Sequence, residues 1–294
     1  MRRSFLGFRA FAKLNLFLEI LRKREDGYHD ICSFMVNVDL ADTLRFRKIR
    51  SDLTLNCDSD EVPSGPDNLC LIAARALRDY TDCREGVEIT LVKGIPVASG
   101  LGGGSSDAAC TLVGVNKLWG LGLTELELLA LAERIGSDVP FFIRGGAQLA
   151  EGRGERLTPV DGFPKTWFVL VTPSLRISSR WAYSVAKMKL TKAGHKSKIM
   201  APGVGPYAAR IAKALRNDLE SGVIGAYPVI RELKDALISS GAMGSLMSGS
   251  GPTVFGVARD RTSATEIASS MGRLGLSVSV VSTVRTGWVE LNCS

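Results

Sequence analysis

Residues 96–109 read PVASGLGGGSSDAA, and this glycine-rich stretch decides the fold. It follows an alternating apolar segment at residues 87–91 and precedes a helical pattern that starts near Ser105. Because glycine lacks a Cβ, the loop lets backbone N–H groups turn inward, and the helix after it adds unpaired N–H groups at its first turn. The sequence therefore predicts a strand, a loop and a helix N-terminus that together bind phosphate.

Two common phosphate-binding patterns do not describe this loop. The G-x-G-x-x-G dinucleotide pattern fits poorly, and G-x-x-x-x-G-K-[ST] is excluded because no lysine follows the glycines. The stretch instead resembles PxxxGLGGGSSDAA, the ATP loop of the GHMP kinase superfamily, which includes galactokinase, homoserine kinase and mevalonate kinase. The resemblance implies that ATP is bound by the residues of this loop: Pro96, Val97, Ala98, Ser99, Gly100, Leu101, Gly102, Gly103, Gly104, Ser105 and Ser106.

Size and composition favour a two-domain protein of the cytoplasm. The chain has 294 residues, 45% of them hydrophobic, and no run of 18 apolar residues, so neither a membrane span nor a membrane partner is expected. Six cysteines without a C-x-x-C pair and two histidines favour reduced thiols and no metal site. The net charge of +7 suits small polyanions such as ATP. The basic run at residues 187–198 has no interleaved aromatics, which argues against nucleic acid.

The N-terminal segment predicts a strand followed by a hairpin. Even positions from 8 to 20 are all apolar, so Lys13 and Asn15 project together from the opposite face. Asp26 and Gly27 then form a turn signal, just before Tyr28 and His29. On these residues alone, a solvent-facing pair and an ordinary hairpin remain alternatives.

The same segment, AFAKLNLFLEILRKREDGYH, resembles APAKINLxLxVxxxRxDGYH, the opening motif of the diphosphocytidyl-methylerythritol kinases. Phe11 stands where proline is common, on the strand and away from the chemistry. The resemblance implies that Tyr28 stacks on a cytosine ring and that His29 hydrogen-bonds its edge. It also implies that Tyr183 is the second aromatic of this sandwich and that Asn15 helps to place the alcohol.

An isolated acid follows the helix predicted over residues 124–135, which begins with a capping box and ends at Gly136. Asp138 lies past the C-terminal end of that helix in an apolar neighbourhood, so its carboxylate needs a charged partner or a functional role. We expect the partner to be Lys13, with a cap or a surface ion pair as the alternative. GSDVPFFIRGGAQLAEGRGE resembles the family motif GSDVPFFxxGGxAxxxGxGE, which implies that Asp138 is the catalytic base and that Lys13 keeps it ionised.

The third motif lies in the second half of the chain, at MSGSGPTVFGV. Read alone it is a hairpin, whereas its resemblance to the third GHMP motif implies that Gly249, Ser250 and Gly251 contact substrate or the ATP loop. Two prolines and a glycine near residues 157–164 predict the boundary between domains 1–160 and 161–294. By resemblance, the fold is α+β. It has an N-terminal domain like domain 2 of ribosomal protein S5, a C-terminal ferredoxin-like sandwich, and the active site in the cleft between them.

The resemblance implies ATP-dependent phosphorylation of the 2-hydroxyl of 4-diphosphocytidyl-2-C-methyl-D-erythritol, a step of isoprenoid precursor synthesis. Mg²⁺ is expected with ATP, although no pair of carboxylates indicates a dedicated metal site. Two alternatives remain: a GHMP kinase for another small alcohol, such as homoserine or mevalonate, and a non-catalytic nucleotide or RNA binder. The sequence gives no signal for an oligomeric state.

Overall fold

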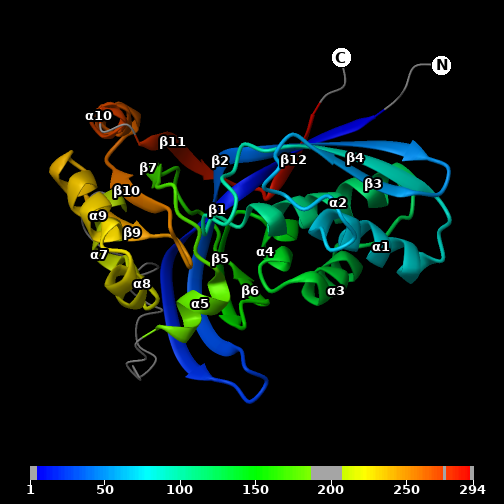
Figure 1. Cartoon of the computed structure of the whole chain (residues 1–294), viewed down its shortest axis with the longest axis horizontal. Helices are drawn as coiled ribbons and strands as arrows, with labels where there is room; N and C mark the ends of the chain where they lie inside the picture. The colour runs from blue at the N-terminus through cyan, green and yellow to red at the C-terminus, as the bar shows by residue number, and fades with distance from the viewer. Residues whose placement is uncertain (1–4, 187–206, 274–275, 292–294) are drawn as a thin grey trace.

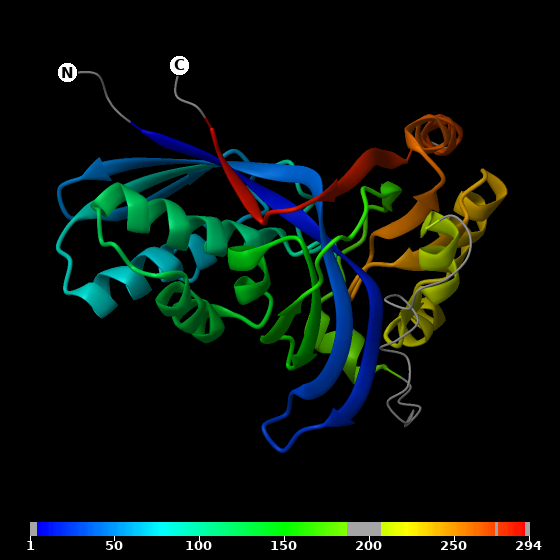
Figure 2. The same ribbon diagram turned by 180° about the vertical axis from the view of Figure 1, so that it is seen from behind.

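A long antiparallel hairpin runs through the whole molecule and organises both halves. The computed structural model describes residues 5–186, 207–273 and 276–291. The hairpin consists of β1 (Leu6–Lys23) and β2 (His29–Ile49), joined by the turn predicted at Asp26 and Gly27. Figures 1 and 2 show these two blue strands between a half that carries α1 to α4 and a half that carries α8 to α10.

The alternation predicted for the first strand is present, but its second face does not meet solvent. Lys13 is 5% exposed and Asn15 is 2% exposed, because later parts of the chain cover them. The structure therefore excludes the solvent-facing alternative for this pair. The second strand of the hairpin is covered in the same way: residues 31–38 are buried on both faces, so they show no polar alternation.

In the N-terminal half, helices cover one face of the sheet. Phe8, Phe46 and Ile89 of the sheet pack in one core with Leu112 and Phe141 of the helices. The strands besides the hairpin are β3 (Leu53–Cys57), β4 (Gly86–Val92), β5 (Ala147–Gly152) and β6 (Arg156–Pro159). The helices are α1 (Leu69–Thr81), α2 (Gly103–Trp119), α3 (Glu125–Ile135) and α4 (Val139–Arg144).

The C-terminal half is an antiparallel sheet with helices packed against it. Its strands follow the order β11, β7, β10, β9, and Val169, Val254 and Ile267 contribute to a core of their own. The strands are β7 (Trp167–Thr172), β9 (Gly244–Met247), β10 (Val254–Ala258) and β11 (Ser277–Val284). The helices are α5 (Ser179–Ser184), α7 (Tyr207–Ala214), α8 (Glu220–Ala226), α9 (Val229–Ser239) and α10 (Arg261–Gly272).

Three strand pairings join the two halves. β11 pairs with both β2 and β7, so the sheet continues from one half to the other. The last strand, β12 (Trp288–Leu291), pairs with β1, and the short β8 (Arg216–Asn217) pairs with β1 as well. The division into residues 1–160 and 161–294 stays a prediction, and the basic run at residues 187–198 lies outside the described residues.

Candidate active site

The glycine loop connects β4 to α2 and leaves its backbone N–H groups open. Gly100 and Gly102 have φ values of +79° and +75°, which L side chains rarely adopt, and Ala98 shares this left-handed region at +53°. The helix begins at Gly103, slightly before the predicted start, and its N-cap residue Gly102 makes no side-chain capping bond. A ligand can therefore receive hydrogen bonds from the first turn.

The turn of the third motif packs directly on this loop. A Cβ on Gly100 would lie 2.2 Å from the Ser248 carbonyl oxygen, so only glycine fits there. The Ser248 hydroxyl donates to the Gly100 carbonyl at 3.2 Å, and the Thr253 N–H donates to the Ser99 carbonyl at 3.2 Å. A Cβ on Gly249 would lie 3.4 Å from Lys13 Nζ, so the same turn also reaches the first strand.

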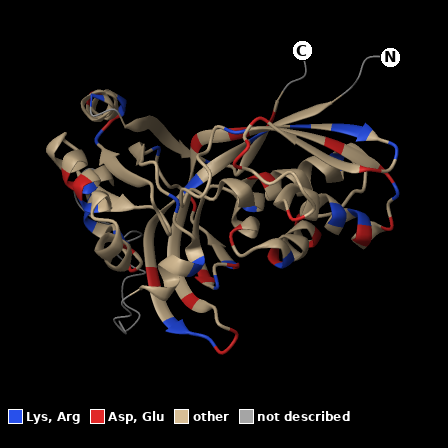
Figure 3. Cartoon of the chain, in the orientation of Figure 1, with Lys and Arg blue, Asp and Glu red and all other residues tan. Residues whose placement is uncertain are grey.

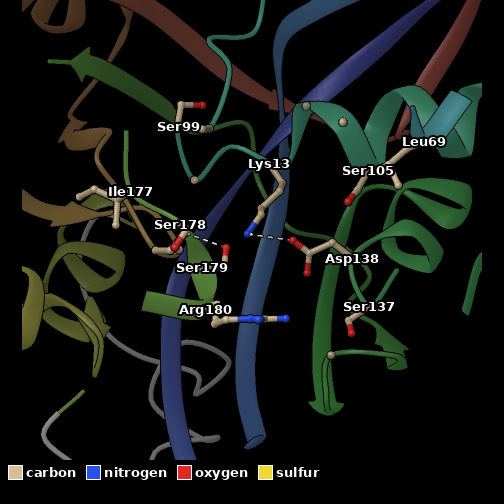
Figure 4. A pocket seen from close by; sticks show the side chains of 18 of the residues that line it. Lys13, Leu69, Ser99, Ser105, Ser137, Asp138, Ile177, Ser178, Ser179 and Arg180 are labelled. Carbon is tan, nitrogen blue, oxygen red and sulfur yellow. Dashed lines mark hydrogen bonds and ion pairs between the residues drawn. The ribbon is translucent and has the colours of Figure 1, made fainter. Parts of the chain in front are cut away.

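Lys13 and Asp138 face one another inside the cleft. Figure 4 shows both side chains pointing into the cavity. Lys13 Nζ lies 3.4 Å from Asp138 Oδ2. The ammonium donates to Asn15 Oδ1 at 2.5 Å, and the Asn15 amide donates to the Ser33 hydroxyl at 2.8 Å. The Lys13 side chain is 6% exposed and that of Asp138 is 39% exposed. The cation is thus fixed in place, while the carboxylate remains accessible to a ligand.

The local position of Asp138 differs in one respect from the sequence-based expectation. It does follow the end of α3, but it also occupies the N-cap position of α4, where its side chain makes no capping hydrogen bond. The carboxylate is therefore not used as a cap. The helix cap, one of the alternatives considered from the sequence, is excluded, and the expected ion pair between Lys13 and Asp138 is present.

An aromatic cluster forms another wall of the same cavity. The rings of His29 and Tyr183 are stacked, with centroids 5.2 Å apart and an interplanar angle of 20°. Burial, together with the charge of Lys23, lowers the pKa of His29. Burial of the Tyr183 ring, and then the charge of Asp138, raise the pKa of its hydroxyl. Tyr28 is 54% exposed, and the guanidinium of Arg153 lies over its ring at 5.2 Å.

One cavity of about 1140 Å³ contains the loop, the ion pair and the aromatic cluster. Its lining includes most of the residues predicted from the sequence: Lys13, Asn15, Tyr28, His29, Pro96, Val97, Ala98, Ser99, Gly100, Gly102, Gly103, Gly104, Ser105, Asp138, Tyr183, Gly249 and Ser250. Three predicted residues, Leu101, Ser106 and Gly251, are not among the lining residues. Leu101 is buried, and the Ser106 hydroxyl donates to the Phe11 carbonyl at 2.7 Å, which makes its contact structural.

Sequence reasoning missed several polar residues that line the cavity. Asn68, Lys93 and Arg153 come from three separate segments, and Arg180 projects across the cavity in Figure 4. Arg153 stands inside the GRGE segment of the second motif, which is the one signal in the sequence that points to it. Among the described residues, no group of three or more His, Cys, Asp or Glu side chains is arranged to hold a metal ion.

Comparisons with known proteins find the same kinase family over both halves of the chain. The family profile of the GHMP kinases N terminal domain matches residues 68–146, and that of the GHMP kinases C terminal region matches residues 207–275. The 4-diphosphocytidyl-2-C-methyl-D-erythritol kinase of Pelobacter propionicus is 45% identical over 88% of this chain and 91% of its own length. The enzyme of the same name from Gloeobacter violaceus is 43% identical over 95% of this chain and 94% of its own length.

Solved structures show the same fold. The crystal structure of a 4-(cytidine 5'-diphospho)-2C-methyl-D-erythritol kinase superposes with a TM-score of 0.77 at 32% identity, covering 94% of this chain and 98% of that one. A homoserine kinase from Cytophaga hutchinsonii has a TM-score of 0.79 at only 17% identity, covering 99% of this chain and 98% of that one. Backbone likeness alone therefore does not distinguish between kinases for different acceptor alcohols.

In the part of the chain that the structure describes, every helix is too short or too polar to cross a membrane.

Proposed function

Because this chain belongs to the GHMP kinase family, we propose that it transfers the γ-phosphoryl group of ATP to the 2-hydroxyl of 4-diphosphocytidyl-2-C-methyl-D-erythritol. The identity of 43–45% with kinases of that name, over most of both chains, is the observation that carries this function. The proposed reaction is a step of isoprenoid precursor synthesis by the methylerythritol phosphate route. A cytoplasmic location is part of the proposal. In the described part of the chain, Cys57, Cys70, Cys83 and Cys110 form no disulfide, which is the state expected of thiols in a reducing compartment.

Phosphoryl transfer requires positioning and charge stabilisation more than covalent chemistry. The N–H groups of the loop and of the first turn of α2 receive the ATP phosphates. Asp138 accepts the proton of the substrate hydroxyl as its oxygen attacks the γ-phosphorus, while the bond from that phosphorus to the bridging oxygen breaks and ADP leaves. Lys13, 3.4 Å from Asp138, forms an ion pair with the carboxylate and stabilises the charge of the group in transfer.

The aromatic cluster is the proposed base-recognition site. Tyr28, His29 and Tyr183 line the cavity that also contains Lys13 and Asp138, so a cytidine bound there can place its attached alcohol toward the ion pair. Asn15 is held against the Lys13 ammonium at 2.5 Å, where its amide can orient the alcohol. Gly249 and Ser250 close the cavity from the C-terminal half.

Mg²⁺ is proposed to arrive with ATP. This ion keeps several waters and usually binds through phosphates and one or two carboxylates, so it needs no preformed cage of side chains. The described residues form no such cage, and Asp138 is the accessible carboxylate nearest to Lys13. When bound, the ion would neutralise phosphate charge. The residues of this chain supply the orientation and the proton acceptor.

A kinase for homoserine or mevalonate is the second candidate, since a homoserine kinase shares the backbone fold. Those substrates contain no base, so they leave the aromatic cluster without a role. A nucleic-acid binder is less well supported, because Figure 3 shows Lys and Arg interspersed with Asp and Glu along the described chain.

A coupled assay of ADP release tests the proposal. Purified protein is supplied with ATP, Mg²⁺ and one of three acceptors: the cytidine diphosphate substrate, homoserine or mevalonate. We expect ADP release with the first acceptor at least about a hundredfold faster than with the others, since their alcohols lack the base that binds the aromatic cluster. Equal or faster turnover with homoserine or mevalonate would reject the proposed substrate.

A further inference from the structure

A buried trio of charged side chains joins the two ends of the glycine loop. Lys93 follows β4, Asp42 stands on β2, and Asp107 stands on α2. The Lys93 ammonium lies 2.5 Å from Asp42 Oδ2 and 3.0 Å from Asp107 Oδ2. The side chains of Lys93, Asp42 and Asp107 are 10%, 0% and 4% exposed, so solvent screens their interactions weakly.

The trio is attached to the loop at both ends. Asp42 Oδ1 accepts hydrogen bonds from the N–H groups of Gly94 at 2.7 Å and Ile95 at 2.8 Å, where the chain leaves β4. At the other end, a Cβ on Gly103 would lie 3.3 Å from Lys93 Nζ, so the ammonium sits directly against the start of α2. The distance between the loop's entry and its exit thus depends on these three side chains.

One ammonium faces two carboxyl groups in the trio, so full ionisation of all three would leave one negative charge uncompensated. Within the described part of the chain, Asp107 Oδ1 is buried and has no hydrogen-bond donor. Burial, and then the charge of Asp42, raise the pKa of Asp107. Removing Lys93 would leave the two carboxylates facing each other in the interior, and they would be expected to move apart.

Two hydrogen bonds connect the end of the loop and the first turn of α2 to β1, the strand that carries Lys13. The N–H of Lys13 donates to the Leu101 carbonyl at 2.9 Å, and the Ser106 hydroxyl donates to the Phe11 carbonyl. The end of the loop and the first turn of α2 are therefore docked on β1 beside Lys13. A change at the trio would move both the phosphate-binding N–H groups and the backbone of the active-site lysine.

We propose that Lys93 is a positioning residue for ATP: by holding Asp42 and Asp107 together, it fixes the spacing between the two ends of the phosphate-binding loop. This inference rests on the role of the loop in the proposed function. It concerns the nucleotide and not the acceptor alcohol.

The test measures ATP binding by calorimetry in the presence of Mg²⁺ and without any alcohol. We compare Lys93→Met, Asp107→Asn, the double variant, and Lys117→Met as a control on the same helix, where the lysine side chain is 55% exposed and paired with Glu290. Lys93→Met should weaken ATP binding about tenfold, since coupled neighbours typically interact strongly. Lys117→Met should stay within about threefold of the unchanged protein. Asp107→Asn, whose amide oxygen can still accept a hydrogen bond from Lys93, should weaken ATP binding less than Lys93→Met does.

The double variant separates positioning from simple loss of a side chain. Because Asp107→Asn removes one of the two carboxylates that Lys93→Met leaves facing each other, adding it to Lys93→Met should return ATP affinity close to that of Asp107→Asn alone. The KM for ATP should follow the dissociation constant, with a smaller change in kcat. ATP affinity of Lys93→Met equal to that of the unchanged protein, or a double variant as weak as Lys93→Met, would overturn the proposal.

If Lys93→Met does not fold, Lys93→Arg carries the same test, because it keeps the charge and places a larger group against Gly103. We then expect a folded variant with ATP binding weakened about threefold or more, and unchanged affinity would contradict the inference. Because the binding experiment contains no alcohol, its outcome does not depend on whether the proposed acceptor substrate is correct.

Discussion

The ammonium of Lys13, from the first strand, lies 3.4 Å from the carboxylate of Asp138, which follows the third helix. The Lys13 ammonium donates a hydrogen bond to Asn15, and its backbone N–H donates to the Leu101 carbonyl. The more exposed aspartate is therefore the partner that can adjust its position. A carboxylate that is accessible, paired with a fixed cation and placed in the same cavity as the glycine loop has the geometry of a proton acceptor in phosphoryl transfer.

Asp138→Asn removes the proton acceptor but keeps the size of the side chain. We expect kcat for the cytidine diphosphate substrate to fall by at least about a hundredfold, the usual scale for a general base. ATP binding should be retained, because the N–H groups of the loop are unchanged. Asp60→Asn, at an exposed position, serves as the control for a lost surface charge. Turnover of Asp138→Asn close to that of the unchanged protein would remove Asp138 from the mechanism.

Gly100→Ala tests whether the loop must lie against the turn of the third motif. The new Cβ would lie 2.2 Å from the Ser248 carbonyl oxygen, so the loop would have to move and the KM for ATP should rise about tenfold or more. Gly122→Ala is the matched control, because Gly122 has a similar φ of +70° but no atom within 4 Å of the place where its new methyl group would lie. If both variants changed the KM for ATP equally, backbone strain alone would explain the effect.

The parts of the site predicted from the sequence depend on local patterns. Consecutive glycines before a helix identify the phosphate loop without any long-range contact, and the alternation from residue 8 to residue 20 places Lys13 and Asn15 on one face. The capping box at Thr124 and Glu127 also has its predicted bonds. These features follow from residues that are neighbours in the sequence.

The parts that were missed depend on contacts between distant segments. β12 returns to pair with β1, and nothing in the sequence of either strand specifies that register. The ion trio joins Asp42, Lys93 and Asp107 from three elements, each of which reads as an ordinary charged position. The resemblance implied that His29 and Tyr183 share one binding site, but not that their rings stack directly on each other. Local propensity carries no information on such pairings.

His29 makes stability depend on pH in a predictable direction. Its pKa is lowered from the ordinary 6.5, mainly by burial, so the folded state favours the neutral ring. The unfolded chain therefore binds a proton first as the pH falls, and stability is lost from about pH 6.5 downward. We expect the melting-temperature advantage over His29→Gln to shrink by about 1 to 3 °C between about pH 8 and pH 5.5. An advantage that stays constant over this range would show that the folded state does not favour the neutral ring.

Tyr183→Ala tests the aromatic cluster as the site of base recognition. Loss of an aromatic stacking partner typically costs about 1 to 3 kcal/mol per base, so the KM for the cytidine diphosphate substrate should rise roughly tenfold. The KM for ATP should change little, because Tyr183 is not part of the phosphate loop. Tyr183→Phe is the matched variant: it keeps the ring that stacks on His29 and removes only the hydroxyl, so it should retain most of the substrate affinity. Steady-state kinetics with each substrate varied in turn will separate the two effects. A rise in the KM for ATP equal to that for the cytidine substrate would mean that Tyr183 supports the cavity as a whole and does not recognise the base.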